Sequence, residues 1–225
     1  MNGSAPKSYT SGRNANTLDS ESDSIGVSAL IGKARRGSKS SLGGLLEAYR
    51  NYLAVLAATR IEKRLLARVS PSDVVQETML RAHKHFGQFR GSTEQELLSW
   101  LRQILVNNLA KFVEQHILAE RRDVRREVSL ERLGAAVEQS AIQLAALIPD
   151  ANASPSRALQ QREEAVALAD RLAQLPADYR EVLVLRNLRG FAFEEIAVRM
   201  ERSVGAARML WLRAIEKLRA AYRKN

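Results

Sequence analysis

The fold class is decided by the stretch FAFEEIAVRMERSVGAARMLWLRAIEKLR, residues 191–219. Its apolar side chains recur at the three- and four-residue spacing of a helix, with a break at the segment MERS, residues 200–203. Ser203, at the end of the break, is a good N-cap for a second helix. The stretch therefore predicts a short helix, a tight turn and a longer helix that crosses the first, which is a helix-turn-helix.

The second of these helices has two faces. In a helical projection its large apolar side chains, Trp211 among them, share one arc that we expect to be buried. The opposite arc begins with small residues and continues with cations, and it carries Gly205, Ala206, Met209, Leu212, Arg213 and Lys217, with Arg208 and Arg219 on its flank. Small residues followed by Arg and Lys suit the major groove of DNA, although a solvated basic face is the alternative. Met209 and Leu212 fit either thymine methyl groups or a protein contact.

The rest of the chain follows the same helical periodicity, and strand-like alternation is absent after residue 25. The sequence therefore predicts an all-α fold. The expected helices run over about 42–66, 71–86 and 94–119, and over a block that starts near Arg157 and is broken at Leu175-Pro176, at Gly190 and at residues 200–203.

The composition changes along the chain and predicts its domain organisation. Residues 1–24 are rich in Ser, Asn, Thr and Gly, which favours a disordered tail. The segment LIPDANASPS, residues 147–156, combines turn formers with two prolines and favours a linker. We therefore expect two small helical domains, 25–120 and 157–225, joined by a linker over 121–156.

Charge and composition narrow the function. The 225 residues include 35 Lys and Arg against 25 Asp and Glu, a formal net charge of +10, and the excess lies in the two predicted domains. An anionic partner such as nucleic acid is implied. The absence of cysteine excludes disulfides, thiolate metal sites and cysteine nucleophiles. With no apolar run of membrane-spanning length and no signal-peptide pattern, we expect a cytoplasmic protein without membrane insertion.

Enzymatic chemistry finds little support in the sequence. His83 and His85 are two positions apart on a predicted helix and so point in different directions, and His116 is remote from both. The segment GKARRGSKS, residues 32–40, is similar to a phosphate-binding loop, but Ser38 interrupts the motif and no strand precedes it. We predict no catalytic residue, no cofactor and no metal.

The N-terminal domain has two candidate binding faces. On the helix over 71–86, which Ser70, Pro71 and Asp73 are suited to start, the apolar stripe Val75, Met79, Ala82 and Phe86 is expected to be buried. The other side carries the carboxylates and amide around one exposed leucine: Asp73, Gln76, Glu77 and Leu80. This cluster fits a protein-docking face, and a solvated face fits the spacing equally well.

The helix over 94–119 carries aromatic, amide and cationic side chains along one margin. They are Trp100, Gln103, Asn107 and Lys111. Such side chains suit a single nucleic-acid strand, whose bases stack and whose phosphates pair with Lys. The same residue types also occur on helix surfaces that bind nothing.

Together, the two domains resemble a bacterial RNA polymerase sigma factor of the extracytoplasmic function (ECF) subfamily. The resemblance is carried by PSDVVQETMLRAHKHFGQFRG (71–91) with SWLRQILVNNLA (99–110), and by LPADYREVLVLRNLRG (175–190) with the opening stretch. It implies a factor that binds core RNA polymerase and directs promoter-specific initiation. Domain 25–120 would be region 2, on the −10 element, and domain 157–225 would be region 4, on the −35 element.

The resemblance also implies roles for individual residues. It assigns Asp73, Gln76 and Glu77, beside Leu80, to the polymerase clamp helices. It assigns Trp100, Asn107 and Lys111 to lining or supporting the path of an unstacked base from the −10 element, next to the loop FGQFRGSTEQE, residues 86–96. In the second domain the predicted promoter contacts are Ser203, Arg208, Met209, Arg213 and Lys217.

This sequence departs from the family pattern at two places. Arg208, Met209 and Leu210 stand where the family commonly has Lys-Ser-Arg or Arg-Ser-Arg, which leaves a changed base preference or a protein contact open. Glu201 and Arg202 occupy a turn that often holds Gly, so one of them is expected to be left-handed.

Two other classes of protein are alternatives to a sigma factor. A helix-turn-helix regulator that does not replace the polymerase sigma subunit would need a dimer seam, and no heptad pattern is evident. A structural adaptor would show no salt-dependent DNA binding. We expect the free factor to be monomeric, with an anti-sigma protein as a further candidate partner.

Overall fold

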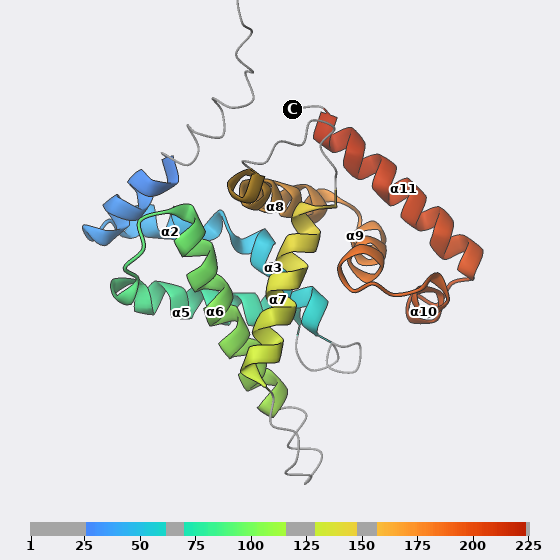
Figure 1. The fold of residues 1–225 in the computed structure, drawn as a ribbon, viewed down its shortest axis with the longest axis horizontal. Helices are drawn as coiled ribbons and strands as arrows, with labels where there is room; N and C mark the ends of the chain where they lie inside the picture. The colour runs from blue at the N-terminus through green and yellow to red at the C-terminus, as the bar shows by residue number, and fades with distance from the viewer. Residues whose placement is uncertain (1–25, 62–69, 116–128, 148–156, 224–225) are drawn as a thin grey trace, which may run out of the picture.

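The computed structural model describes residues 26–61, 70–115, 129–147 and 157–223. Within these ranges every regular element is helical, which confirms the all-α prediction. The elements are a helix over 26–35, α2 (Lys39–Glu47), α3 (Arg50–Arg60), α5 (Pro71–His85), the 3-10 turn η1 (Phe86–Gln88), α6 (Glu94–Val113), α7 (Leu130–Ala145), α8 (Arg157–Gln174), α9 (Ala177–Leu183), the π-helical turn η3 (Val184–Leu188), α10 (Phe193–Arg199) and α11 (Val204–Arg223) (Figure 1).

Side-chain caps fix where the main helices begin. Ser70 accepts a hydrogen bond from the backbone N–H of Asp73, and the Asp73 carboxylate accepts one from the N–H of Ser70, so the predicted capping box at the start of α5 is confirmed. Thr93 and Glu96 form a second capping box at the start of α6. Each box satisfies backbone donors that the first helical turn leaves without an intrahelical partner.

The single helix predicted over 42–66 is wrong, because the structure has α2 and α3 there, joined at Ala48 and Tyr49. The N–H of Tyr49 bonds to the carbonyl of Leu46, which tightens the end of α2 and lets the chain change direction. Tyr49 is buried at this corner, and its hydroxyl donates to Glu94 at 2.8 Å. The tertiary contact outweighs the helical periodicity that continues across the break.

The predicted linker over 121–156 also needs a correction, because it contains helix α7. Val137, Ala141 and Leu144 are buried, and α7 packs against α3, α6 and α8. These residues share one face of an amphipathic helix. The neutral net charge of the segment did not indicate this face. The expected proline-rich turn at 148–156 and the predicted tail at 1–24 lie outside the described residues.

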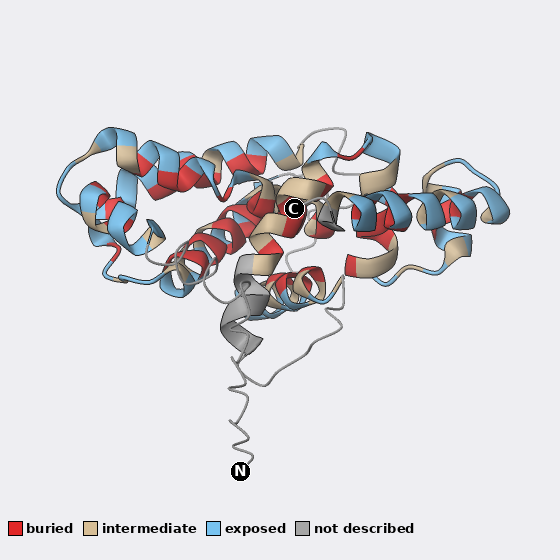
Figure 2. Cartoon of the chain, turned by 90° about the horizontal axis from the view of Figure 1, so that it is seen from above, coloured by how far each residue is buried: buried red, intermediate tan, exposed pale blue. Residues whose placement is uncertain are grey.

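Helix α3 lies at the centre of the molecule and joins its two halves. It contacts α5 and α6 on one side, and α7, α8 and η3 on the other. In Figure 1, α2, α5 and α6 lie to one side of α3 and α9–α11 to the other, with α11 at the outer edge. The buried side chains of both halves belong to one continuous apolar core (Figure 2).

Polar contacts accompany the apolar packing between the halves. Asn51 on α3 donates a hydrogen bond to Asp170 on α8 at 2.8 Å. Arg102 on α6, whose side chain is only 8% exposed, pairs with Glu138 on α7 at 2.8 Å and donates to the Tyr52 hydroxyl at 2.9 Å. Each contact spans two helices, so these bonds fix how α7 and α8 sit on the N-terminal half.

Among the described helices, none has the length and apolar character needed to cross a membrane.

The hydrogen bond between Asn51 and Asp170 can be tested by changing the charge at either position. Asn51→Asp places a carboxylate against Asp170, and we expect it to lower the free energy of unfolding, measured by urea titration, by about 1–2 kcal/mol through lost hydrogen bonding and repulsion. Adding Asp170→Asn restores an amide donor facing a carboxylate, and most of the loss should be recovered. A double variant no more stable than Asn51→Asp alone would contradict the pairing.

Candidate functional sites

Helix α5 presents the predicted docking face. Val75, Met79, Ala82 and Phe86 are buried, as predicted from their spacing. Asp73 and Gln76 are exposed, Leu80 is 59% exposed, and Glu77 is half-buried beside Arg81, with which it pairs at 2.7 Å. The structure therefore brings all four residues to one surface, with a large apolar side chain among polar groups.

Asp73 also has a structural role, because its carboxylate completes the capping box at the start of α5. The hydrogen bonds from Ser70 lower the pKa of Asp73 below its usual value. Asp73 is therefore ionised at neutral pH, as a contact to a basic partner would require. A substitution at Asp73 would disturb the start of α5 as well as any such contact, whereas Gln76 and Leu80 lie beyond the cap.

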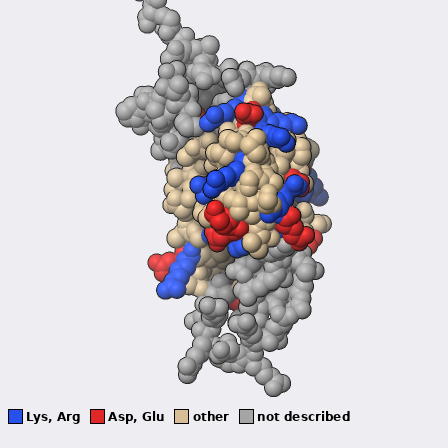
Figure 3. Space-filling view, turned by 90° about the vertical axis from the view of Figure 1, so that its right-hand side faces the viewer, with Lys and Arg blue, Asp and Glu red and all other residues tan. Residues whose placement is uncertain are grey.

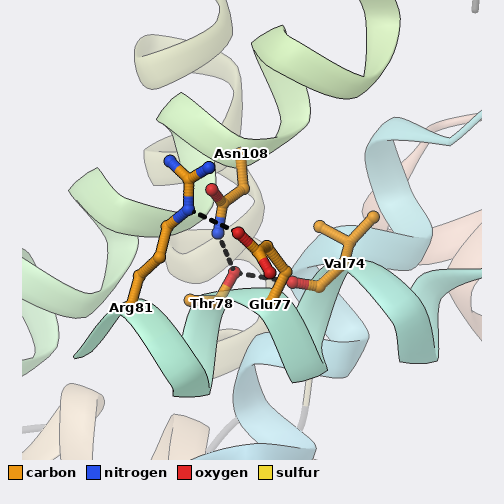
Figure 4. A network of polar contacts seen from close by, with 5 residues as sticks. All are labelled: Val74, Glu77, Thr78, Arg81 and Asn108. Atoms are coloured by element: carbon orange, nitrogen blue, oxygen red, sulfur yellow. Dashed lines mark hydrogen bonds and ion pairs between the residues drawn. The ribbon is translucent and has the colours of Figure 1, made fainter. Parts of the chain in front are cut away.

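A buried polar contact fixes α6 on α5. Asn108, only 1% exposed, donates from Nδ2 to the Thr78 hydroxyl at 3.0 Å, and that hydroxyl donates to the Val74 carbonyl at 2.7 Å (Figure 4). Asn108 therefore faces inward, toward α5. Because a buried polar pair is costly to leave unmatched, this contact sets the register of the two helices.

The margin of α6 keeps its predicted order. Gln103, Asn107 and Lys111 are exposed, and the Gln103 side chain donates from Nε2 to the side-chain Oδ1 of Asn107 at 3.1 Å. Trp100 lies on the same side but is half-buried. Asn107 precedes the buried Asn108, so the contact that fixes α6 on α5 also fixes where the exposed amide points.

Trp100 is part of an aromatic cluster that supports the loop before α6. Its ring centroid lies 5.2 Å from that of Phe89 and 6.1 Å from that of Phe86. Phe86 and Phe89 are buried. Of the two roles that the resemblance allowed, lining or supporting the strand path, the packing of Trp100 fits support.

The C-terminal half forms the predicted helix-turn-helix from α10 and α11. Ser203 accepts a hydrogen bond from the N–H of Ala206 at 3.2 Å, as expected of an N-cap. Glu201 in the turn has a φ of 55°, which confirms the expected left-handed residue. Ala197 on α10 and Ala207 on α11 are both buried, and such small side chains allow a close crossing.

Trp211 was predicted to lie in the core, and the structure places it at the core margin. It is half-buried, its indole N–H donates to Asn187 at 2.9 Å, and its ring meets Phe193 edge-on at 5.9 Å. A Trp that can reach a polar partner is commonly left at such a boundary. Ala214, Ile215 and Leu218 on the same helix are fully packed.

The outward arc of α11 is exposed as predicted. Met209 is 49% and Leu212 is 45% exposed. The arc also includes Gly205, Ala206, Arg208, Arg213, Lys217 and Arg219, all exposed. Viewed from the α11 side, cations and carboxylates are interspersed on a largely uncharged surface (Figure 3). This face is mixed in charge and partly apolar.

Some of the predicted cations on α11 already have neighbours. Arg208 lies 3.7 Å from a Glu194 carboxylate and over the Phe193 ring, and Lys217 lies over the Tyr179 ring. An exposed ion pair of this length contributes little and exchanges easily for a phosphate. Arg208 therefore remains available to an anionic partner.

Among the described residues, no cluster of three or more His, Asp or Glu is able to hold a metal ion. Sequence reasoning missed several residues that organise the structure. Arg35 was set aside with a false phosphate-binding motif, yet it donates to backbone carbonyls of the loop before α6. Because Arg35 and this loop are far apart in the sequence, no local pattern indicated the contact.

Comparison with known families identifies both halves. Residues 45–116 match the family model described as Sigma-70 region 2, and residues 165–218 match Sigma-70, region 4. The chain belongs to the sigma-70 family, in its ECF subfamily. Region 2 thus includes the exposed face of α5 and the margin of α6, and region 4 includes the helix-turn-helix.

Relatives match along most of the sigma factor. It is 27% identical to the ECF RNA polymerase sigma-E factor of Haemophilus influenzae over 84% of this chain and 92% of that protein. It is 28% identical to the RNA polymerase sigma-H factor of Pseudomonas aeruginosa, over 84% and 90%. The ECF RNA polymerase sigma-E factor of Escherichia coli K12 is 24% identical, over 88% and 94%.

Two solved structures are also similar to this sigma factor. One, described as the RsbN-BldN complex, is 20% identical over 85% of this chain and 98% of that chain. The other, CnrH in complex with the cytosolic domain of CnrY, is 23% identical over 88% and 97%. Both have a TM-score of 0.30, a similarity that supports no conclusion about function.

The cap at the start of α6 predicts a pH dependence of stability. Hydrogen bonds from Ser92 and Thr93 lower the pKa of Glu96 below its usual 4.5. A depressed carboxyl pKa adds stability above the usual value, and that stability is lost as the pH falls through the lowered one. We expect Glu96→Gln to flatten the decline in unfolding free energy between about pH 5 and pH 3.

The matched control for Glu96 is Glu131→Gln, which removes an exposed carboxylate from the first turn of α7. Chemical denaturation at a series of pH values measures both variants. An acid profile of Glu96→Gln equal to that of the unchanged protein would contradict the assignment of the cap.

Proposed function

We propose that this protein binds core RNA polymerase through the exposed face of α5 and directs it to a two-part promoter. Region 2 captures the opened −10 strand and region 4 reads the −35 duplex. The observation that carries the proposal is that one chain holds both matched regions, with the polar and apolar face of α5 and the outward arc of α11 both exposed. Catalysis belongs to the polymerase, and the sigma factor needs no cofactor or metal.

The α5 face supports the polymerase contact through its composition. Leu80 supplies exposed apolar area at the centre, and Asp73, Gln76 and Glu77 supply polar partners around it. Interfaces commonly combine an apolar centre with a polar rim. The side chains beneath are fully packed, so the face is presented by a rigid helix.

The strand contact rests on α6 and the loop before it. Extracting a base from a duplex costs a few kcal/mol, which stacking and phosphate contacts have to offset. Asn107 and Lys111 supply an amide and a cation on one exposed margin. Trp100 supports the loop from below through its contact with Phe89.

The duplex contact is assigned to α11. Gly205 and Ala206 leave space at the helix start, Ser203 is exposed beside them, and Arg213 is exposed further along. We propose that Met209 contacts thymine methyl groups, because it lies between the small residues and the cations on the same arc. Arg208 and Lys217 would contact phosphates at the flanks.

The remaining assignments concern the state of the free factor. We propose that it is monomeric and acts in the cytoplasm, where it meets the polymerase. A separate anti-sigma protein is a further proposed partner. The alternative, a helix-turn-helix regulator that leaves the polymerase's own sigma subunit in place, would bind duplex DNA without binding core enzyme.

The proposed function is tested by transcription from a genomic DNA library with core enzyme, with and without this protein. We expect a set of start sites that depend on the protein and share a two-part upstream sequence, together with co-elution of the protein with core enzyme. Duplex binding without either result would favour the regulator.

The docking face is tested with Leu80→Ala and Gln76→Ala. Because neither side chain is part of the α5 cap, we expect each to weaken core binding by about 5- to 50-fold, as truncation at an interface centre does, while binding to −35 duplex is unchanged. His85→Ala is the control, since it changes an exposed residue of α5 outside this face. Wild-type affinity in both face variants would contradict this assignment.

The duplex contact is tested with Arg213→Ala in a salt titration. Losing one cation at the groove should weaken −35 duplex binding by about 1–3 kcal/mol if Arg213 reads a base, or reduce the salt slope by about 1 if it contacts phosphate. Core affinity should not change. Glu216→Gln, an exposed change on the same helix, is the control, and equal duplex affinity in Arg213→Ala and wild type would refute the role.

A further inference from the structure

The loop between η1 and α6 is held from a distant part of the chain. Arg35, in the helix over 26–35, donates a short hydrogen bond to the carbonyl of Gly91, 56 residues away, and a longer one of 3.5 Å to the carbonyl of Phe89. Loop carbonyls have no helical partner, and a bond from a charged donor is among the stronger ways to satisfy them. The guanidinium thus joins two points of one turn.

The other end of this loop is fixed by α6. The Glu96 carboxylate accepts from the N–H of Ser92 at 2.8 Å, and from the N–H and hydroxyl of Thr93 at 3.0 Å and 2.9 Å. The Phe89 ring is held against Trp100. Residues 89–93 are therefore anchored at both ends, while Arg90, Ser92 and Thr93 remain exposed.

Gly91 shows how closely the loop backbone is packed. A Cβ atom at this position would lie 2.6 Å from Cβ of Glu96 and 2.6 Å from the Phe89 ring. No side chain fits without moving both neighbours. The carbonyl that Arg35 contacts thus belongs to a residue whose backbone position is tightly constrained.

We propose that Arg35 is a positioning residue for base capture in the −10 element. Its guanidinium holds the carbonyls of Phe89 and Gly91, and so fixes the loop before the strand arrives. The inference rests on the proposed function, in which this loop and α6 take the unstacked base. Preorganising a binding loop lowers the ordering cost that would otherwise weaken binding. Arg35 itself lies before both matched sigma-70 regions, which begin at residues 45 and 165.

The test uses holoenzyme and a single-stranded non-template oligonucleotide that spans the −10 element of a promoter found by start-site mapping. An abasic substitution is moved along the oligonucleotide, and the captured base is the position where its removal weakens binding to the wild-type holoenzyme, by about 10-fold. Arg35→Ala should bind the intact oligonucleotide about 10-fold more weakly and lose most of the abasic effect, to less than about 2-fold, because the two changes remove one interaction.

Two further variants separate positioning from charge and from folding. Arg36→Ala removes the same charge one position along, from an exposed residue, and should keep the full abasic effect. Arg35→Lys keeps the charge but replaces the guanidinium, whose Nη2 contacts both carbonyls, by a shorter side chain with a strongly hydrated ammonium, so its abasic effect should be intermediate. Arg35→Lys also carries the test if Arg35→Ala does not fold, and core affinity should be unchanged in every variant.

The inference is overturned if the folded Arg35 variants show the full wild-type abasic effect, whatever their overall affinity, because the two losses would then be independent. A wild-type holoenzyme insensitive to abasic substitution at every position gives a different result. It removes base capture itself, and with it both the proposed function of region 2 and the role of Arg35.

Discussion

The structure depends on the packing of α6 against α5. Leucines at 97, 101, 105 and 109 are buried along α6, and the bond from Asn108 to Thr78 sets how the two helices align. Apolar packing alone tolerates small shifts between helices, whereas the bond from Asn108 Nδ2 to the buried Thr78 hydroxyl requires one alignment of the two helices. The face of α5 around Leu80 and the margin of α6 at Asn107 and Lys111 are therefore two surfaces of one rigid unit.

This constraint links polymerase binding to strand capture. If α5 is docked on the polymerase, α6 and the loop before it are placed as well, because little can move between them. The caps at Ser70 and Thr93 contribute to the same end by fixing where each helix begins. Region 4 is not part of this rigid α5–α6 unit, since it has to reach a separate element of the promoter. Its helix-turn-helix packs internally through Ala197 and Ala207, and α11, with the proposed duplex-binding face, lies at the outer edge of the molecule.

The sequence alone predicted the all-α fold, the two capped helix starts at Ser70 and Ser203, the inward and outward faces of α5 and α11, and the outward margin of α6. These features follow from local spacing, which a single helix already specifies. The break at Tyr49, the marginal position of Trp211 and the packing of α7 could not be predicted in this way. Each depends on a partner remote in sequence: Glu94 for Tyr49, Asn187 for Trp211 and Arg102 for α7. The loop contact of Arg35 is another case.

We propose that separate faces of this sigma factor recognise polymerase and promoter, and hydroxyl-radical footprinting tests this division most directly. Leu80 on α5 and Met209 on α11 are both exposed and oxidisable in the free factor. We expect core RNA polymerase to protect Leu80, and Met209 to become protected only when promoter DNA is added. Protection of Met209 by core enzyme alone, or continued oxidation of Leu80 in the holoenzyme, would contradict this division.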